Sequence, residues 1–378
     1  MKRIYLDNNA TTPLDPHVLE LLTTIQQNSF GNPSSIHSFG QEAKAHLVKA
    51  RLELAELFGV RSQEVLFTSS ATEALNLLLR GFFGAHPTGH MITSKGEHAA
   101  VFKTVEALQA QGVQVTYLDI GPTGAPSVEQ LECALRPDTR LICLMAVNNE
   151  TGVISDIQAF AELARRHAIP LLVDGVALFG KMAFTLHPGV SGICFSGHKF
   201  HGPKGVGFAI IRKGLKLTPY LTGGEQEYGL RAGTENLASI VAMAEAAKMA
   251  VDTLKPSCQH MQMLLEAFEA KITQLLPNAR VNGQSPRIAN TSNICFTGTD
   301  GEALLMFLDL NGVAVSLGSA CSSGAIEPSR VLLEMGLSRK EALSSLRFSF
   351  SRFNTLEEVD RTIELLQQFH QIILTSSK

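Results

Sequence analysis

Short apolar runs and longer amphipathic stretches alternate along the first two thirds of the chain. Runs such as 65–68, 113–118 and 140–147 are short and mostly apolar, as expected of buried strands. Between them, stretches such as 157–168 repeat apolar residues at the 3.6-residue period of an amphipathic helix. Strands that alternate with helices in this way form βαβ units. The pattern therefore predicts an α/β fold with a mostly parallel sheet and helices on both of its faces.

The pattern changes in the last third of the chain. Residues 237–276 are helical in composition with an interruption at Pro256, and shorter helices and strands alternate after them. A chain of 378 residues is long enough for two domains, at about 100–200 residues each. We predict a large α/β domain at 15–253 and a smaller α/β domain that combines 1–14 with 254–378.

Composition and charge exclude several classes of protein. Hydrophobic residues make up 45% of the chain and charged residues 18%, which is ordinary for a globular protein. The net charge of −3 gives no electrostatic attraction to nucleic acid. No apolar run approaches the roughly 20 residues that cross a bilayer, and residues 1–7 are not followed by the apolar segment of a signal peptide. We therefore expect neither a nucleic-acid partner nor a membrane partner.

The six cysteines indicate a reducing compartment. Their spacing is irregular and contains no C-x-x-C pair, and four of them lie in apolar or helical contexts that are typical of buried free thiols. No spacing of histidines and cysteines indicates a metal site. A cytoplasmic location is the expectation that fits these thiols best.

Polar residues follow several of the predicted strands. Ligands bind at the carboxyl ends of the strands in open α/β sheets, so these positions are candidate site residues. Residues 69–72, Ser-Ser-Ala-Thr, open a helix directly after a strand, where backbone N–H groups and the helix dipole attract an anion. An ordinary N-cap is the plainer interpretation of the same residues. His98, Asn149 and Asp174 follow three further strands and add an imidazole, an amide and a carboxylate.

The loop at 196–205 completes this set of polar groups. It lies between two apolar runs and is dense in the glycine and proline that fix a loop. Ser196, His198 and Lys199 supply a hydroxyl, an imidazole and an amine, although the loop alone fits a solvated surface turn equally well. A phosphate cradle, an amine and an acid are the parts that a pyridoxal phosphate site needs. Neither of the glycine-rich motifs that bind dinucleotides or nucleoside triphosphates occurs in the chain.

Nine short motifs, in order along nearly the whole chain, resemble those of a known family. They lie at 5–13, 31–35, 67–73, 97–98, 147–152, 196–199 (SGHK), 202–205 (GPKG), 231–236 (RAGTEN) and 318–321 (GSAC). The chain resembles the cysteine desulfurases of the NifS/IscS type, which are class V aminotransferases among the fold-type I pyridoxal-phosphate enzymes. The resemblance implies pyridoxal 5'-phosphate as the cofactor and L-cysteine as the substrate.

The resemblance also assigns cofactor contacts. It implies that Lys199 bonds covalently to the cofactor, that Asp174 pairs with the pyridine nitrogen, and that His98 stacks on the ring and moves protons. Spacing alone does not separate Lys199 from Lys204, the second lysine of the loop. The cofactor phosphate is assigned to Ala71, Thr72, Ser196, His198 and, from the neighbouring subunit, Thr234. That last assignment implies a homodimer with its site at the subunit interface.

Substrate and sulfur contacts are implied in the same way. Asn149 is assigned to both cofactor and substrate, and Asn8 and Arg347 are further substrate contacts. Arg347 suits the substrate's carboxylate because a guanidinium can donate two parallel hydrogen bonds to it. A surface ion pair is the plainer interpretation of Arg347. Cys321 lies among the small residues of 316–324, where a thiol is reachable by solvent and nucleophilic.

The implied reaction removes sulfur from L-cysteine. Lys199 takes the Cα proton, Cys321 attacks the substrate's sulfur and becomes a persulfide, and alanine is released. Lys199, His98 and Cys321 are therefore the catalytic candidates. The sulfur is expected to pass to an acceptor protein, such as an iron–sulfur cluster scaffold.

Departures from the family pattern leave alternatives open. Ala177 stands where the family usually has glutamine, so one hydrogen bond to the cofactor, worth ~0.5–1.5 kcal/mol, is absent. Glu225 and Tyr228 replace a glycine and an arginine near the expected substrate entrance. The alternatives are another pyridoxal-phosphate reaction, namely selenocysteine lysis or transamination, and a degenerate non-catalytic regulator of the same fold. Cys321 favours desulfuration, because a transaminase has no use for this thiol.

Overall fold

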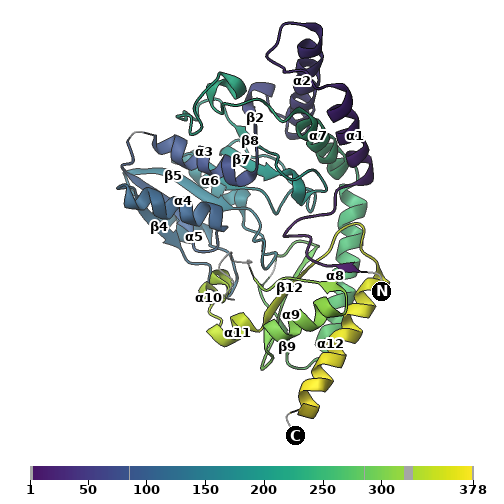
Figure 1. Cartoon of the computed structure of the whole chain (residues 1–378). Coiled ribbons are helices and arrows are strands. Elements are labelled where there is room, and N and C mark those ends of the chain that lie inside the picture. Colours follow the sequence, from purple (N-terminus) through teal and green to yellow (C-terminus); the bar gives the residue numbers. More distant parts are fainter. Residues whose placement is uncertain (1–2, 85, 285, 319–326, 377–378) are drawn as a thin grey trace.

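A seven-stranded sheet forms the centre of the larger part of the molecule (Figure 1). The computed structural model describes residues 3–84, 86–284, 286–318 and 327–376. The strands are β2 (Val65–Thr68), β3 (His90–Ser94), β4 (Gln114–Leu118), β5 (Thr139–Met145), β6 (Leu171–Asp174), β7 (Val190–Ser196) and β8 (Gly207–Ile211). Their order is β2-β8-β7-β6-β5-β3-β4. β8 pairs antiparallel with β2 and β7, and the other neighbours pair in parallel.

Helices cover both faces of this sheet. They are α1 (Pro16–Asn28), α2 (Ser38–Phe58), α3 (Ala71–Phe83), α4 (Ala99–Ala110), α5 (Val128–Ala134), α6 (Ile157–Arg166) and α7 (Leu237–Asp252). Successive residues of a strand point to opposite faces. Leu66 accordingly packs in the core that contains α3 and α4, whereas Val65 and Phe67 pack in the core that contains α1, α2, α6 and α7. The predicted α/β class, with a mostly parallel sheet between helices, is confirmed.

A second core belongs to the smaller part of the molecule. Its strands are β1 (Ile4–Tyr5), β9 (Ala279–Val281), β10 (Thr291–Phe296), β11 (Val313–Ala314) and β12 (Ser345–Ser349), and its helices are α8 (Leu254–Leu275), α9 (Gly301–Leu310) and α12 (Leu356–Ser376). The short helices α10 (Arg330–Glu334) and α11 (Arg339–Leu343) form a separate apolar cluster with Ile120. β1 pairs with β11, and β10 lies between β9 and β12. The buried apolar residues of this core come from 4–6 and 264–366. Those on the large sheet come from 18–250 and Ile288. We keep the division at 15–253 as a proposal that this grouping supports.

Some details of the helical stretch differ from the predicted pattern. The helical stretch is interrupted at Thr253, between α7 and α8, and not at Pro256. Pro256 lies in the first turn of α8, where its missing N–H removes no hydrogen bond within the helix. β9 and α11 have three and five residues, which is too short for a periodic pattern to predict them.

The described residues contain no membrane-spanning helix, no disulfide and no metal-binding cluster. No helix among these residues is both long enough and apolar enough to cross a membrane. The cysteines at 133, 143, 194, 258 and 295 have free thiols. No three histidine, cysteine, aspartate or glutamate side chains in this part of the chain come together as they do around a metal ion.

A buried ion pair anchors the segment that leads to Thr234. Arg51 of α2 donates to both carboxylate oxygens of Glu227, at 2.9 and 2.5 Å, and Glu227 also accepts from the backbone N–H of Phe67 at 2.8 Å. Glu227 and Tyr228 both have left-handed backbone conformations, with φ of 48° and 59°. Residues other than glycine rarely adopt such φ values unless the surrounding structure stabilises them. The ion pair therefore fixes an otherwise unfavourable turn.

Replacing Arg51 with methionine should destabilise the protein strongly. The change leaves the Glu227 carboxylate buried without its cation, which lowers the free energy of unfolding by about 3–5 kcal/mol. Denaturant unfolding measures this loss. Lys49→Met is the matched control on the same helix, because Lys49 pairs with Glu53 at the surface and its loss costs at most about 1 kcal/mol. Equal effects of the two changes would contradict this role of the buried pair.

Candidate active site

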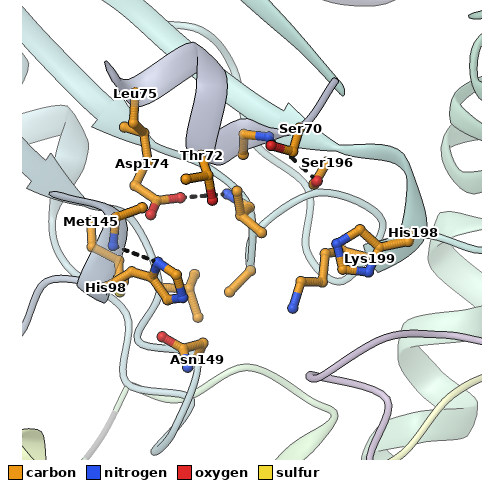
Figure 2. Close-up of a pocket in the computed structure, with 15 residues that line it drawn as sticks. Ser70, Thr72, Leu75, His98, Met145, Asn149, Asp174, Ser196, His198 and Lys199 are labelled. Carbon is orange, nitrogen blue, oxygen red and sulfur yellow. Dashed lines mark hydrogen bonds between the residues drawn. The ribbon is translucent and has the colours of Figure 1, made fainter. Parts of the chain in front are cut away.

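A cavity of about 220 Å³ opens where several strands of the large sheet end (Figure 2). Because parallel strands end at the same edge of a sheet, residues far apart in the sequence meet there. The predicted site residues that line this cavity are Ala71, Thr72, His98, Asn149, Asp174, Ser196, His198 and Lys199. Figure 2 shows Asp174 and Lys199 reaching the cavity from different sides, with His98 near Asn149. The sequence prediction of one shared site at the sheet edge therefore agrees with this geometry.

The start of α3 forms one wall of the cavity. Ser70 caps the helix by accepting from the backbone N–H of Glu73 at 3.3 Å, and the backbone N–H of Ala71 donates to Ser196 Oγ at 3.4 Å. Gly207 of β8 allows this approach, since a Cβ there would lie 2.8 and 3.0 Å from backbone atoms of Ser70 and Ala71. Amide groups at the start of a 13-residue helix and the Ser196 hydroxyl suit an anion such as a phosphate.

Asp174 ends β6 and is buried without an ion-pair partner among the described residues. Among the described residues, its carboxylate accepts one hydrogen bond, from the backbone N–H of Val176 at 3.0 Å. Burial raises the pKa of its carboxyl group above the ordinary value, although His98 and Lys199 oppose that change. A buried carboxylate is costly unless a cation pairs with it. The protonated ring nitrogen of pyridoxal phosphate is a cation of the required kind, so the residues present fit this cofactor.

Lys199 lies in a short 3-10 helix, Gly197–Lys199, directly after β7. Its Nζ donates to the backbone oxygens of Asn9 at 2.5 Å and Ala10 at 2.9 Å. Burial and the charge of Arg347 lower the pKa of this amine to about 8. At neutral pH a larger fraction of Lys199 is therefore in the neutral form than for a surface lysine. The neutral amine is the nucleophilic and basic form.

Two histidines line the cavity, and each makes a hydrogen bond through Nδ1. The Nδ1 of His98 accepts from the backbone N–H of Ala100 at 3.1 Å, so a neutral His98 ring carries its proton on Nε2. Burial, Lys199 and Lys204 lower the pKa of His198 to about 4. His198 is therefore neutral at pH 7, and its Nδ1 lies 3.2 Å from Thr11 Oγ1.

Glu97 is a fully buried acid beside these groups. One of its oxygens accepts from Ser94 Oγ at 2.6 Å and from the backbone N–H of Met145 at 3.0 Å, while Oε2 has no partner among the described residues. Burial raises its pKa to about 8, and the charge of Asp174 contributes. Glu97 is therefore mostly protonated at pH 7 and adds no negative charge next to Asp174. The sequence pointed to Glu97 only as part of a motif.

Four other predicted residues lie elsewhere. Arg347 of β12 is buried beside the cavity, where Nη2 pairs with Asp7 at 2.6 Å and Nη1 donates to the backbone oxygen of Asn149 at 3.1 Å. Asn8 donates to the backbone oxygen of Ser349 at 2.8 Å and does not line the cavity. Thr234 is exposed and does not line it either, and Cys321 lies outside the described residues. The plainer interpretation of Arg347 as a member of an ion pair agrees with the structure, but the pair is buried and does not lie at the surface.

Ala177, the departure from the family pattern, is part of the cavity wall. It is buried and lies three residues after Asp174. Its methyl group gives this wall an apolar contact and no hydrogen-bond donor.

Sequence reasoning missed two polar residues behind the cavity, Asn9 and Lys181. Asn9 accepts hydrogen bonds from both Lys199 and Lys181. Lys181 is buried, with 6% of its surface exposed. A usable signal was present for Lys181, because it follows the apolar residues of 176–179 close to the end of a buried strand. A lysine in such a stretch needs a reason to be there.

Comparison with known proteins places the chain in a family. The model of the family described as Aminotransferase class-V matches residues 4–362. The chain is 39% identical to a protein named cysteine desulfurase IscS from Dictyoglomus turgidum, over all of this chain and 97% of that relative. A solved structure titled NifS-like protein aligns with a TM-score of 0.92 at 35% identity, over 98% of this chain and all of the other. SspA in complex with cysteine aligns with a TM-score of 0.83 at 32% identity, over 94% of this chain and all of the other. The chain therefore belongs to the aminotransferase class V family.

Proposed function

We propose that this chain is a pyridoxal-phosphate-dependent cysteine desulfurase. It converts L-cysteine to L-alanine and transfers the sulfur to a thiol of the enzyme. The observation that carries this proposal is that Lys199 and Asp174 line the same cavity. The pKa of the Lys199 amine is lowered, and the Asp174 carboxylate has no ion-pair partner among the described residues. Similarity over the full length to a relative named cysteine desulfurase supports L-cysteine as the substrate.

The residues of the cavity have separate tasks toward the cofactor. Lys199 would bond covalently to the cofactor, and Asp174 would pair with its protonated ring nitrogen. His98 and Asn149 would contact the ring. Ala71, Thr72, Ser196 and His198 would hold the phosphate. When bound, pyridoxal phosphate draws electrons away from the substrate's Cα and so weakens the bonds around it.

Proton transfer at Cα is the task of Lys199. The lowered pKa keeps a useful fraction of the free Lys199 amine neutral near pH 7 to 8, so that it could accept this proton. Asn149, Asn8 and Arg347 orient the substrate. Arg347 supports this assignment because its Nε is buried without a partner in the described part of the chain. A carboxylate that approaches it would supply the missing acceptor.

Cys321 receives the sulfur. Its thiolate attacks the substrate's Sγ and forms an S–S bond with its own electron pair, while the Cβ–Sγ bond breaks and leaves its pair on the carbon fragment. That fragment takes up protons and leaves as alanine, with His98 as the proton carrier. No outside oxidant or reductant is needed until the persulfide is passed on. Cys321 then delivers its outer sulfur to an acceptor protein, for which we propose an iron–sulfur cluster scaffold.

Two copies of the chain form the working enzyme in this proposal. Thr234 is exposed and lies on a segment held by the Arg51–Glu227 pair and by Arg231, which pairs with Glu73 at 2.8 Å. Thr234 does not line the cavity of its own chain, which supports a phosphate contact made in the other subunit. The free thiols of the described cysteines support a reducing, cytoplasmic location.

The proposed activity is tested with the purified protein and L-cysteine. We expect a yellow protein that, with added pyridoxal phosphate and a thiol reductant, produces alanine and sulfide in equal amounts. Pyruvate in place of alanine would indicate different pyridoxal-phosphate chemistry, and turnover with selenocysteine alone would indicate a selenocysteine lyase. A colourless protein that takes up no cofactor would contradict an enzymatic function.

A further inference from the structure

Lys181 is a buried amine that the proposed reaction does not use. It follows β6 and has 6% of its surface exposed. Its Nζ makes one hydrogen bond, to Asn9 Oδ1 at 3.3 Å, and it has no carboxylate partner within ion-pair distance among the described residues. A buried ammonium without a counter-ion destabilises a fold, and an apolar side chain of similar length would pack at lower cost. Folding alone therefore gives no reason for a lysine here.

A small second cavity lies directly behind Lys199. It measures about 20 Å³, which is room for about one water molecule. Lys199 lines both this cavity and the larger one, and Lys181 lines the smaller one. The amine proposed to hold the cofactor thus has the active site on one side and a second amine on the other.

Asn9 joins the two lysines. Its side-chain oxygen accepts from Lys181 at 3.3 Å and from Asn290 at 3.1 Å, and its backbone oxygen accepts from Lys199 at 2.5 Å. Its side-chain nitrogen donates to the backbone oxygen of Asn149 at 3.0 Å. Because every polar atom of this side chain is bonded, Asn9 holds Lys181 at a fixed position relative to Lys199.

The charged groups around the pair are mostly cationic. Lys199 and Arg347 act on Lys181 and, with burial, lower its pKa to about 7. Lys181 in turn lowers the pKa of His198 and His201, and Arg352 lines the same small cavity. Asp174 and Asp7 are the acids that act on Lys199. Because repulsion between two like charges is mutual, a protonated Lys181 disfavours a proton on the Lys199 nitrogen by the same amount.

We propose that Lys181 is a positioning residue whose charge, held behind Lys199 by Asn9, lowers the proton affinity of the Lys199 nitrogen. This inference rests on the proposed role of Lys199 as the residue bonded to the cofactor. Its consequence is that the free Lys199 amine would be neutral and able to accept the Cα proton. The loss of the glutamine donor at Ala177 makes such a control from the protein side more important in this chain.

The test is a pH titration of the visible absorbance of the protein loaded with pyridoxal phosphate, which needs no turnover. Lys181→Met removes the charge, so the midpoint for protonation at the Lys199 nitrogen should move up by about one pH unit. Lys181→Gln, which keeps a donor for Asn9, should give the same shift, and Lys181→Arg should stay within a few tenths of wild type. Lys204→Met removes an exposed charge from the same loop and should not move the midpoint.

The possible outcomes separate this inference from the proposed function. A wild-type midpoint in both Lys181→Met and Lys181→Gln would overturn it. A shift in only one of the two would also overturn it, because that result would come from packing and not from charge. In Lys199→Ala the titrating band should be absent. If the band persists there, the proposed role of Lys199 fails, whereas an unmoved midpoint with that role intact refutes the role of Lys181 alone.

Discussion

Replacing Lys199 with alanine is expected to reduce alanine formation from L-cysteine by about a thousandfold or more. The change removes the covalent link to the cofactor and the base that takes the Cα proton, and a positioned base alone contributes about 10²–10⁴-fold. The protein should still bind pyridoxal phosphate, because the phosphate cradle and Asp174 remain. Rates of alanine formation, measured at saturating L-cysteine and cofactor, test this expectation.

Lys204 provides the matched control for that change. It lies on the same loop five residues later but is exposed and does not line the cavity. Lys204→Ala should therefore keep at least about half of the wild-type rate, because surface substitutions away from a site have small effects. If Lys204→Ala lost the activity and Lys199→Ala kept it, the assignment of the two lysines would have to be exchanged.

Asp174→Asn is expected to have the second largest effect, a loss of about 10²–10³-fold in turnover. An amide cannot hold the proton on the ring nitrogen, so the cofactor's capacity to accept electrons falls, and removal of one well-placed electrostatic contact costs about this much elsewhere. Affinity for pyridoxal phosphate should weaken as well, since the buried cation loses its partner. Steady-state rates and absorbance titration with the cofactor measure the two effects separately.

Glu97→Gln is the control for the change from carboxyl to amide. Glu97 is buried at the same edge of the sheet, but its raised pKa makes it mostly neutral already at pH 7. Substituting a neutral amide for a neutral acid should therefore reduce turnover less than tenfold. If Glu97→Gln matched the loss in Asp174→Asn, the effect would reflect disturbance of the buried wall and not the charge of Asp174.

Much of the sheet and of its edge could be predicted from local pattern. An apolar run that ends in a polar residue, as before Asp174 and Ser196, marks the end of a buried strand, and parallel strands bring such ends together. The same reasoning placed His98 after a strand, where it caps α4. These features depend on neighbouring residues only, so the sequence carries them plainly.

Contacts between distant segments could not be predicted in this way. Arg347 and Asp7 are 340 positions apart, and their pair forms because the chain after β1 pairs with β12 at Asp7 and Ser349. Lys181 and Lys199 face one small cavity only because the Asn9 loop passes between them. No periodicity or spacing in a single sequence reports such an arrangement. The assignment of Thr234 depends in addition on a second subunit.

Transfer of the substrate's sulfur to Cys321 is tested most directly by a single turnover without reductant. The loaded protein is mixed with L-cysteine that carries a heavy sulfur isotope, alanine is quantified, and the peptide with residue 321 is weighed by mass spectrometry. We predict one alanine for each heavy sulfur atom found on Cys321, and neither product in Cys321→Ala. Alanine formed at the wild-type rate in Cys321→Ala, or without heavy sulfur on Cys321 in the wild type, would contradict the account.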